Sequence, residues 1–538
     1  MKLFCTLWSA LLLALWSAPA SAEKRPVVRI AQGKLVGDWQ DGIRSFRAIP
    51  YAAPPVGDKR WRPPGPAAGW QGVRDARAFG PACMQTPYPA ESVYFERPLP
   101  MSEDCLTLNI WMPSQAAKAP VLVWIHGGAL LRGSSASPLY DGVGFAKRGV
   151  VFVSINYRLG ILGWLAHPAL SAEARQRISG NYGLLDQIAA LEWVRDNIAA
   201  FGGDPARVTV MGESAGALSI TYLLTSPRAR GLFARAILQS ANIRPVPALR
   251  EPVFGLQPAE ATGLEIGRRL GAHSLADLRA IDARALVASA LKLGFVSQGT
   301  VDGVVLPAQV VESFDRGQQA RVPILAGFNG GEVRSQRALV PAIPATTADY
   351  EREIRRRYLD LAPAFLRLYP ASDMTESLVA ATRDAVYGWA SERMVRQQTA
   401  AGQPAYLYLF DHCYPAARNR GLCAFHASEL PFTFGRTGER AKLPPNWPVP
   451  GDAADRALAA RMIDYWTAFA RTGRPSSRIG PDWPAYGTDQ AYMRFARAAS
   501  VQRDLLPGMF ELQEQIVARR RSRGEPWFTN IGPAAPIP

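Results

Sequence analysis

The most informative stretch of this chain is Val208-Thr209-Val210-Met211-Gly212-Glu213-Ser214-Ala215-Gly216, followed by Ala217-Leu218-Ser219-Ile220. Residues 208–211 are apolar or β-branched and predict a short buried strand, whereas the run after Gly216 predicts a helix. Small residues two places before and two places after Ser214 let the chain turn sharply, which exposes the serine hydroxyl at the helix N-terminus. We therefore predict that Ser214 is the nucleophile of a serine hydrolase.

Five further apolar runs predict that this strand belongs to a large central sheet. Their hydrophobicity is nearly continuous rather than alternating, which is typical of strands buried on both faces of a mostly parallel sheet. The runs are 121–125, 151–155, 236–238, 323–326 and 406–410. Helical spacing of apolar residues, clearest at 184–200 and 454–470, alternates with these strands and predicts an α/β, doubly wound fold with helices on both faces.

Two segments, 250–320 and 335–400, show helical patterns without strong strands, so we expect them to be helical insertions over the site. With 538 residues and 48% hydrophobic composition, the chain can bury a large core. It contains no internal repeat and no low-complexity linker. We therefore expect a single domain over residues 23–538.

The first 22 residues have the features of a secretory signal peptide. Lys2 precedes an apolar run from Leu3 to Trp16, and Ala20-Ser21-Ala22 gives an A-x-A cleavage pattern. The run is shorter than the ~20 residues that span a bilayer, and no later stretch is long and apolar enough. We predict that residues 1–22 are removed and that the protein is exported, to the periplasm or outside the cell, without membrane insertion.

The whole chain has a formal net charge of +16, from 61 Lys and Arg against 45 Asp and Glu. Nucleic-acid binding would call for basic stripes interleaved with aromatic residues or for a known module, and neither is present. We interpret the arginine runs 355–357 and 519–521 as solvated helix faces. No nucleic-acid partner is expected, but a basic protein attracts anionic small molecules through its long-range field.

Four cysteines lie outside the predicted signal peptide: Cys83, Cys105, Cys413 and Cys423. An even number in an oxidising compartment predicts two disulfides, for which three connectivities exist. Sequence proximity favours the pairs Cys83–Cys105 and Cys413–Cys423, and four free thiols are the alternative.

A serine nucleophile needs a base, which follows the serine and the acid along the chain in α/β hydrolases. Of the five histidines, only His273, His412 and His426 come after Ser214. His426 lies in a loop of small residues after the expected strand 406–410, where a catalytic histidine should be placed. His412 follows that strand immediately, which suits a structural role. We predict that His426 is the base.

The acid should follow a strand between the elbow and the histidine. Glu332 does so, after the expected strand 323–326 and within a glycine-rich loop. Donors for the oxyanion should come from a glycine-rich turn after an early strand and from the residue after the nucleophile. We predict that the backbone N–H groups of Gly128, Ala129 and Ala215 supply them.

Taken together, these motifs resemble the type-B carboxylesterases, the family of cholinesterases and bacterial para-nitrobenzyl esterases. The likeness runs from about residue 28 to residue 500. The matching segments are 46–57, 103–110, 154–160, 180–187, 201–205, the elbow and 426–432. The resemblance implies an α/β-hydrolase fold, a triad of Ser214, Glu332 and His426, and a Cys83–Cys105 loop. It also implies that Ser240 and Glu429 support the triad, and that no cofactor or metal is needed.

The chain departs from the family pattern at positions that bear on the substrate. Ala129 stands where the family has a third glycine, so the oxyanion turn needs backbone angles that accept a Cβ. The span between Cys83 and Cys105 has no tryptophan, which cholinesterases use to bind a quaternary ammonium. Residues 333–337 replace the aromatic residues that follow the acid in cholinesterases. Choline esters are therefore not expected.

We expect an exported, cofactor-independent carboxylic-ester hydrolase that acts on small-molecule esters. The alternatives are a non-catalytic, cholinesterase-like binding or adhesion protein, and a lipase with an apolar lid. Arg132, Arg334 and Arg337 lie next to the catalytic motifs and are candidates to bind a substrate carboxylate. Such a site would favour esters of di- or tricarboxylic acids, and some family members cleave tricarballylic esters from the fungal toxin fumonisin. The alternative is that all three arginines face solvent or surface carboxylates.

Overall fold

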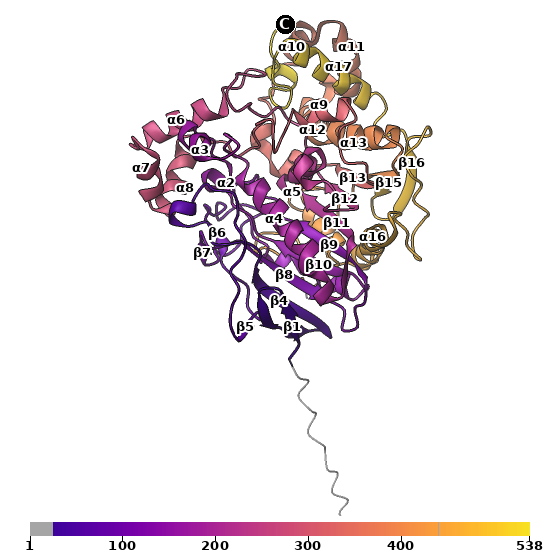
Figure 1. Ribbon diagram of the computed structural model, residues 1–538. Coiled ribbons are helices and arrows are strands. Elements are labelled where there is room, and N and C mark those ends of the chain that lie inside the picture. The colour runs from indigo at the N-terminus through magenta and orange to yellow at the C-terminus, as the bar shows by residue number, and fades with distance from the viewer. Residues whose placement is uncertain (1–24, 439–440) are drawn as a thin grey trace, which may run out of the picture.

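The computed structural model describes residues 25–438 and 441–538, so the predicted signal peptide at 1–22 lies outside the described residues. An eleven-stranded sheet runs through the centre of the molecule (Figure 1). Its strands, in spatial order, are β16 (Ala499–Arg503), β15 (Ala491–Phe495), β14 (Ala405–Phe410), β13 (Ile324–Asn329), β12 (Arg235–Gln239), β11 (Gly203–Glu213), β9 (Ala119–Ile125), β10 (Val151–Ile155), β8 (Thr107–Met112), β4 (Ile43–Pro50) and β3 (Asp38–Gln40).

The strands from β15 to β10 in this order pair in parallel, which confirms the predicted mostly parallel sheet. The outer pairs β16–β15, β10–β8, β8–β4 and β4–β3 are antiparallel. Two small sheets lie outside this one. They consist of β1 (Val27–Ile30), β2 (Gly33–Val36) and β5 (Val73–Asp75), and of β6 (Ala82–Cys83) and β7 (Met101–Ser102).

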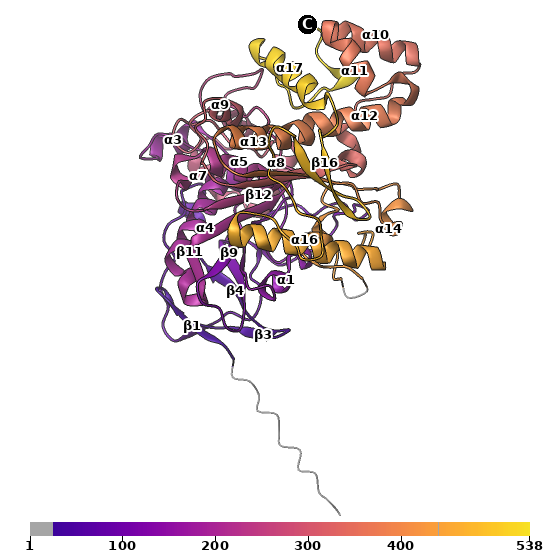
Figure 2. The same cartoon turned by 90° about the vertical axis from the view of Figure 1, so that its right-hand side faces the viewer.

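Helices cover both faces of the large sheet, as Figure 2 shows for α16 on one side and α4 and α5 on the other. Alternate side chains of β9 point to opposite faces, because successive residues of a strand do so. Val123 and Ile125 belong to the core shared with α4 and α5, whereas Leu122 and Trp124 belong to the core shared with α16. All seven residues of β9 are buried, which explains its continuous hydrophobicity.

Seventeen α-helices are described, and those in 250–320 and 335–400 form the expected helical insertions. The helices are α1 (Val143–Ala146), α2 (Gly160–Trp164), α3 (Pro168–Glu173), α4 (Tyr182–Asn197), α5 (Ala215–Thr225), α6 (Ala259–Arg269), α7 (Leu275–Ala280), α8 (Ala283–Lys292), α9 (Val310–Asp315), α10 (Thr347–Tyr358), α11 (Ala362–Leu368), α12 (Met374–Arg383), α13 (Trp389–Ala400), α14 (Pro415–Arg418), α15 (Leu430–Thr433), α16 (Ala453–Thr472) and α17 (Met509–Ser522). Within the described ranges, none of them is both long enough and apolar enough to cross a membrane.

The carboxyl ends of β9, β11, β12, β13 and β14 meet at one edge of the sheet. Gly212 pairs with Ile125 on one side and with Leu238 on the other, and Asn329 pairs with Phe410. Because parallel strands end at the same edge, the loops that follow them converge there. This edge is where the predicted site residues should meet.

Candidate active site

The turn from β11 to α5 holds Ser214 in an uncommon backbone conformation. Its φ is 55° and its ψ is −120°, which few residues with a side chain adopt. A Cβ added to Gly216 would lie 2.0 Å from the carbonyl oxygen of Ile125, and one added to Gly212 would lie 2.6 Å from the carbonyl carbon of Gly216. The two glycines are therefore required by close backbone approach, and they allow the sharp turn that presents Ser214.

The structure brings Ser214, His426 and Glu332 together from three loops. His426 Nε2 lies 2.8 Å from Ser214 Oγ, and His426 Nδ1 lies 2.5 Å from Glu332 Oε2. The side chain of Glu332 is fully buried, and 4% of His426 is exposed. A serine, an imidazole and a carboxylate in this line have the geometry of nucleophile, base and orienting acid.

The other oxygen of Glu332 is also occupied. Glu332 Oε1 accepts hydrogen bonds from Ser240 Oγ at 2.6 Å and from the backbone N–H of Asn329 at 2.8 Å. The backbone N–H of His426 donates to the carbonyl of Glu332 at 3.2 Å. These contacts fix the rotamer of the carboxylate, so that Oε2 faces the imidazole.

Glu429 lies in the same buried network but does not contact the imidazole. Its carboxylate accepts from Asn329 Nδ2 at 2.5 Å and from Gln239 Nε2 at 3.0 Å. Burial raises the pKa of Glu429 to about 7, and the nearby charge of Glu332 adds to this shift. Glu429 thus ties the last residue of β13 to the last residue of β12.

A third carboxylate, that of Glu213, lies against the imidazole. Glu213 Oε1 is 3.2 Å from His426 Nε2, on the side where Ser214 binds. Burial by itself lowers the pKa of His426, but the charges of Glu213 and Glu332 outweigh it and raise that pKa to about 9. Burial also raises the pKa of Glu213 to about 8, and the positive charge of a protonated His426 opposes this shift.

The turn after β9 has the backbone conformation of a small-residue loop. Gly128 has φ 104° and Ala129 has φ 59°, so Ala129 is a residue with a Cβ in the left-handed region. A Cβ on Gly128 would lie 2.2 Å from the carbonyl oxygen of Arg132, which explains the glycine. Ala215 is the first residue of α5, where the backbone N–H has no acceptor within the helix. Gly128 and Ala129 line the same cavity as Ser214.

His126, which begins that turn, is buried and stacked on Tyr157 with ring centroids 4.5 Å apart. Burial lowers the pKa of His126 to about 4, which keeps the ring neutral. His412 instead contacts Asp455 in the first turn of α16, at 2.6 Å. Neither ring is hydrogen-bonded to Ser214. Among the described residues, no group of three or more His, Cys, Asp or Glu side chains is placed to hold a metal ion.

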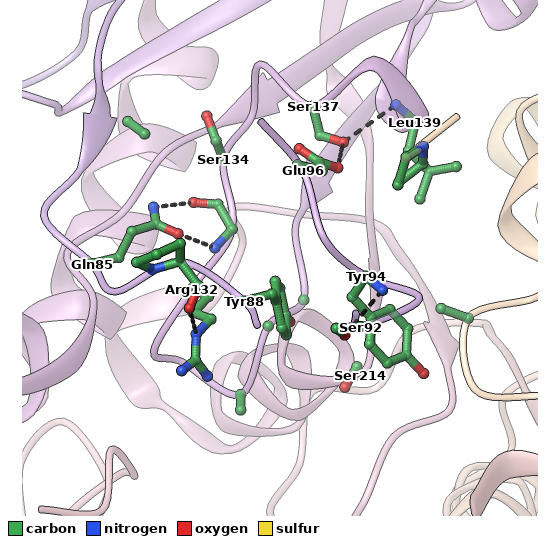
Figure 3. A pocket seen from close by; sticks show the side chains of 18 of the residues that line it. Gln85, Tyr88, Ser92, Tyr94, Glu96, Arg132, Ser134, Ser137, Leu139 and Ser214 are labelled. Carbon is green, nitrogen blue, oxygen red and sulfur yellow. Dashed lines mark hydrogen bonds between the residues drawn. The ribbon is translucent and has the colours of Figure 1, made fainter. Parts of the chain in front are cut away.

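Ser214 opens into a cavity of about 530 Å³ (Figure 3). The segment between Cys83 and Cys105 contributes more of its lining than any other segment, including Tyr88, Tyr94 and Glu96. The helical insertions contribute Arg284 from α8 and Ser335 and Gln336 from the loop after Glu332. The disulfide loop and the segment after β9 are therefore the two main walls of the cavity, a role of the disulfide loop that the sequence alone did not indicate.

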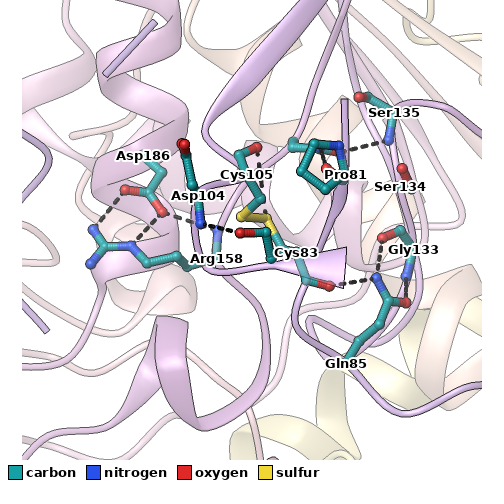
Figure 4. The surroundings of a disulfide bond; sticks show 12 residues. Pro81, Cys83, Gln85, Asp104, Cys105, Gly133, Ser134, Ser135, Arg158 and Asp186 are labelled. Carbon is teal, nitrogen blue, oxygen red and sulfur yellow. Dashed lines mark hydrogen bonds and ion pairs between the residues drawn. A yellow bond between two sulfur atoms is a disulfide. The ribbon is translucent and has the colours of Figure 1, made fainter. Parts of the chain in front are cut away.

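Both expected cysteine pairs lie at disulfide-bonding distance. Cys83 and Cys105 have sulfurs 2.05 Å apart, and the Cα atoms of Cys413 and Cys423 are 4.4 Å apart. Figure 4 shows the surroundings of the first pair. Two residues after Cys83, the side chain of Gln85 exchanges two hydrogen bonds of 2.8 Å with the backbone of Gly133. This contact joins the disulfide loop to the end of the turn that contains Gly128.

Two tyrosines contact the His426 loop, and sequence reasoning missed both. Tyr94 Oη donates to the carbonyl of His426 at 3.0 Å and lies 2.6 Å from Ser335 Oγ. The ring of Tyr387, which lies in the π-helical turn Asp384–Gly388, is 5.1 Å from the ring of His426. A π-helical turn beside a histidine is a common mark of a functional position, but only the fold reveals it.

Of the three arginines proposed to bind substrate, only Arg132 reaches the cavity. The guanidinium of Arg334 is paired with Glu376 of α12, with one N–O distance of 3.0 Å. Arg337 is exposed and does not line the cavity. Arg334 and Arg337 thus do not line the cavity that contains Ser214, and the guanidinium of Arg334 already binds a protein carboxylate.

Comparison with known proteins places this arrangement among esterases. A sequence model described as the carboxylesterase family matches residues 24–509. The chain is 38% identical to a fumonisin B1 esterase of Sphingopyxis macrogoltabida, over 88% of this chain and 87% of that protein. It is 34% identical to a para-nitrobenzyl esterase of Bacillus subtilis, over 86% of this chain and 92% of that protein.

Solved structures with a similar fold are also esterases. A carboxylesterase structure from Geobacillus stearothermophilus matches with a TM-score of 0.76 and 37% identity, covering 91% of this chain and 100% of that one. A para-nitrobenzyl esterase structure matches with a TM-score of 0.79 and 31% identity, covering 91% of this chain and 99% of that one. The predicted α/β-hydrolase fold is confirmed.

Proposed function

The chain belongs to the carboxylesterase family, and from that premise we propose that it hydrolyses carboxylic esters through an acyl-enzyme formed on Ser214. It is an enzyme of the carboxylesterase class, since its relatives are named esterases and carboxylesterases. The observation that carries the proposal is the line of short contacts from Ser214 through His426 to Glu332.

The proposed reaction uses the imidazole as a proton carrier. With a proton on Nδ1, His426 donates to Glu332, and its Nε2 accepts the proton of Ser214 as Oγ attacks the ester carbonyl. The tetrahedral oxyanion would be stabilised by backbone N–H groups of the Gly128 turn and of Ala215. The imidazolium then gives its proton to the departing alkoxide, and an acyl-enzyme remains.

Deacylation repeats these steps with water as the nucleophile. His426 takes a proton from water, hydroxide adds to the acyl carbonyl, and Ser214 leaves with the proton returned by the imidazolium. Glu332 stays ionised throughout and stabilises the positive ring, and Ser240 and Asn329 keep it aimed. Apart from the ester and water, both halves of this scheme use only groups of the chain itself.

Replacement of Ser214 tests this function directly. We expect Ser214→Ala to lower kcat/KM for a p-nitrophenyl ester by at least ~10³-fold, because the nucleophile is removed. A fluorophosphonate probe should label the native protein on Ser214 and should leave the variant unlabelled. Comparable turnover by the variant would contradict the proposed mechanism, and failure of the folded native protein to be labelled would favour a non-catalytic binding protein.

The natural substrate is proposed to be an ester of a di- or tricarboxylic acid. Two observations support this class: a relative at 38% identity is named a fumonisin B1 esterase, and Arg132 lines the cavity. A carboxylate near the scissile ester would bind a guanidinium through paired hydrogen bonds. A clear preference for a neutral alkyl ester over its carboxylate-bearing analogue, at low and at high salt, would contradict this part of the proposal.

Export is proposed together with removal of residues 1–22, leaving one catalytic domain over residues 23–538. The two cysteine pairs at disulfide distance support an oxidising compartment. The mass of the protein recovered from the periplasm or the medium should correspond to a chain that begins at Glu23. A full-length protein retained in the cytoplasm would contradict it.

A further inference from the structure

We propose that Arg132, Arg97 and Arg284 together form a carboxylate-binding site at the mouth of the cavity that contains Ser214. The proposal rests on ester hydrolysis at Ser214 and names what recognises the substrate beside the scissile bond. All three arginines line this one cavity, although they come from three places in the chain. Arg132 follows β9, Arg97 lies in the disulfide loop, and Arg284 is near the start of α8.

Arg132 is held in one orientation by the disulfide loop. Its Nε donates to the carbonyl of Thr86 at 2.9 Å, and its guanidinium lies over the ring of Tyr88, 5.1 Å from the centroid (Figure 3). Its backbone N–H donates to the carbonyl of Gly128 at 2.9 Å. Within the described part of the chain, its two terminal nitrogens have no protein acceptor, so they can bind a carboxylate bidentately.

Arg97 and Arg284 are exposed at the edge of the cavity. Among the residues that the structure describes, neither guanidinium has a hydrogen bond or an ion pair with the protein. The guanidinium of Arg334, in contrast, is paired with the carboxylate of Glu376. A ligand carboxylate that binds Arg97 or Arg284 therefore displaces no protein carboxylate, which favours binding.

Two carboxyl groups line the same cavity and must be weighed against the three guanidinium groups. Glu96 accepts a hydrogen bond from Ser137 Oγ at 2.5 Å, and burial raises its pKa. Burial likewise raises the pKa of Glu213 to about 8. Arginine stays charged, so the three guanidinium groups outnumber the two carboxyl groups of the lining even where both carboxyl groups are ionised.

This arrangement fits a substrate with one or more free carboxylates and a hydrocarbon part. Leu139, Leu430 and Trp447 line the cavity as well and offer apolar contacts to carbon chains. Arg132 lies beside the oxyanion turn and would contact the carboxylate nearest the scissile ester. Arg97 and Arg284, which are more exposed, would contact a second or third carboxylate.

The test compares matched esters in matched variants. One pair places the carboxylate on the acyl side: mono-p-nitrophenyl glutarate and p-nitrophenyl pentanoate. A second pair places it on the alcohol side: 4-carboxyphenyl butyrate and phenyl butyrate. We expect the native enzyme to prefer the charged ester of at least one pair, and the kcat/KM ratio of that pair to fall about tenfold in Arg132→Gln. Smaller losses are expected in Arg97→Gln and Arg284→Gln, which are more exposed.

Arg337→Gln is the matched control, because Arg337 is exposed and outside the cavity lining. Its ratio should equal that of the native enzyme. No preference for the charged ester in either pair would overturn the proposal, as would a ratio that Arg132→Gln leaves unchanged or that Arg337→Gln lowers as much.

Binding measured without turnover separates this site from the reaction. Calorimetry on the Ser214→Ala protein should show that tricarballylate binds, that its triamide does not, and that adding Arg132→Gln raises Kd about tenfold. Absence of tricarballylate binding would overturn the proposed site even if ester hydrolysis holds. Binding of tricarballylate by a native protein that hydrolyses no ester would overturn the proposed hydrolysis and retain the site.

Discussion

His426 can accept a proton only where it is neutral, and Glu213 and Glu332 control that range. Their charges raise the pKa of His426 to about 9 against the opposing effect of burial. The reaction needs the neutral ring, so kcat/KM should fall as the pH drops through this raised pKa. We expect Glu213→Gln to move this acidic limb to lower pH, since it removes one of the charges that raise the pKa.

The pH dependence of kcat/KM for a neutral p-nitrophenyl ester measures this shift. Glu91→Gln is the control, because Glu91 is exposed and does not line the cavity. The control should retain the native profile. If the acidic limb of the kcat/KM profile stays in place in Glu213→Gln, or moves to higher pH, the charge of Glu213 does not raise the pKa of His426.

Tyr94 is a second residue whose role can be isolated. Its hydroxyl joins the carbonyl of His426 to Ser335, which follows Glu332 by one short helical turn. We expect Tyr94→Phe to lower kcat several-fold with a smaller change in KM. The substitution removes the hydroxyl that links the His426 loop to the Glu332 loop, but it keeps the aromatic ring at position 94.

Tyr492→Phe serves as the comparison, since Tyr492 lies on β15 away from the cavity. It should leave kcat unchanged. An unaltered kcat in Tyr94→Phe, or a loss seen only in KM, would assign Tyr94 to the cavity wall rather than to the positioning of His426.

At the scale of elements, the elbow between β11 and α5 depends on the space that Gly216 leaves beside β9. A Cβ there would lie 2.0 Å from the carbonyl oxygen of Ile125. We expect Gly216→Ala to destabilise the protein by about 1–3 kcal/mol and to lower activity, because the helix must move away from the strand. Thermal unfolding and ester hydrolysis would be measured together.

Gly65→Ala is the control for this change. A Cβ at Gly65 meets no heavy atom within 4 Å, so the same substitution should be tolerated there. Equal losses of stability and activity in both variants would mean that the close approach of α5 to β9 is not the cause of the effect at Gly216.

The loop that contains His426 is braced by the Cys413–Cys423 pair, three residues before the histidine. The two cysteines are 10 residues apart, and closing a loop of that size contributes about 2–3 kcal/mol in the chain-entropy description. The same loop is also joined to the acid loop, because the N–H of Gly331 donates to the carbonyl of Ala424 at 2.9 Å. We expect Cys413→Ser with Cys423→Ser to lower the melting temperature and kcat.

Peptide mapping without reduction should recover the Cys413 and Cys423 peptides as one linked species. Alkylation of either cysteine in the native protein would contradict the bond. Unchanged turnover in the double variant would show that the contact with Gly331 holds the loop without help from the disulfide.

At the scale of the whole molecule, the large excess of Lys and Arg over Asp and Glu should attract anionic substrates before they reach the cavity. Raising the ionic strength from about 0.01 M to 1 M shortens the Debye length from ~30 Å to ~3 Å. We expect kcat/KM for a carboxylate-bearing ester to fall several-fold over this range, while that of a neutral ester changes little. Equal salt dependence for both esters would argue against electrostatic attraction.

The sequence predicted those parts of the protein that depend on neighbouring residues. The elbow at Ser214 and the turn at Gly128 were predictable because close backbone contacts allow only small residues there. The strands β9 to β14 were predictable because burial on both faces demands continuous hydrophobicity. The strands β3, β4, β8, β15 and β16, on the two sides of the sheet, were not identified. The edge strands β3 and β16 are partly exposed and have weak hydrophobic patterns, and polar residues such as Asn109 interrupt the buried strand β8.

The tertiary structure decided which distant residues meet. Glu213 is a neighbour of the serine in sequence, yet its contact with His426 and its raised pKa follow from burial among other carboxyl groups. Arg334 and Arg132 both flank catalytic motifs, but only Arg132 enters the cavity, because Glu376 of a separate helix binds Arg334. Side-chain direction and burial depend on contacts between segments far apart in the chain, and a local sequence pattern does not predict those contacts.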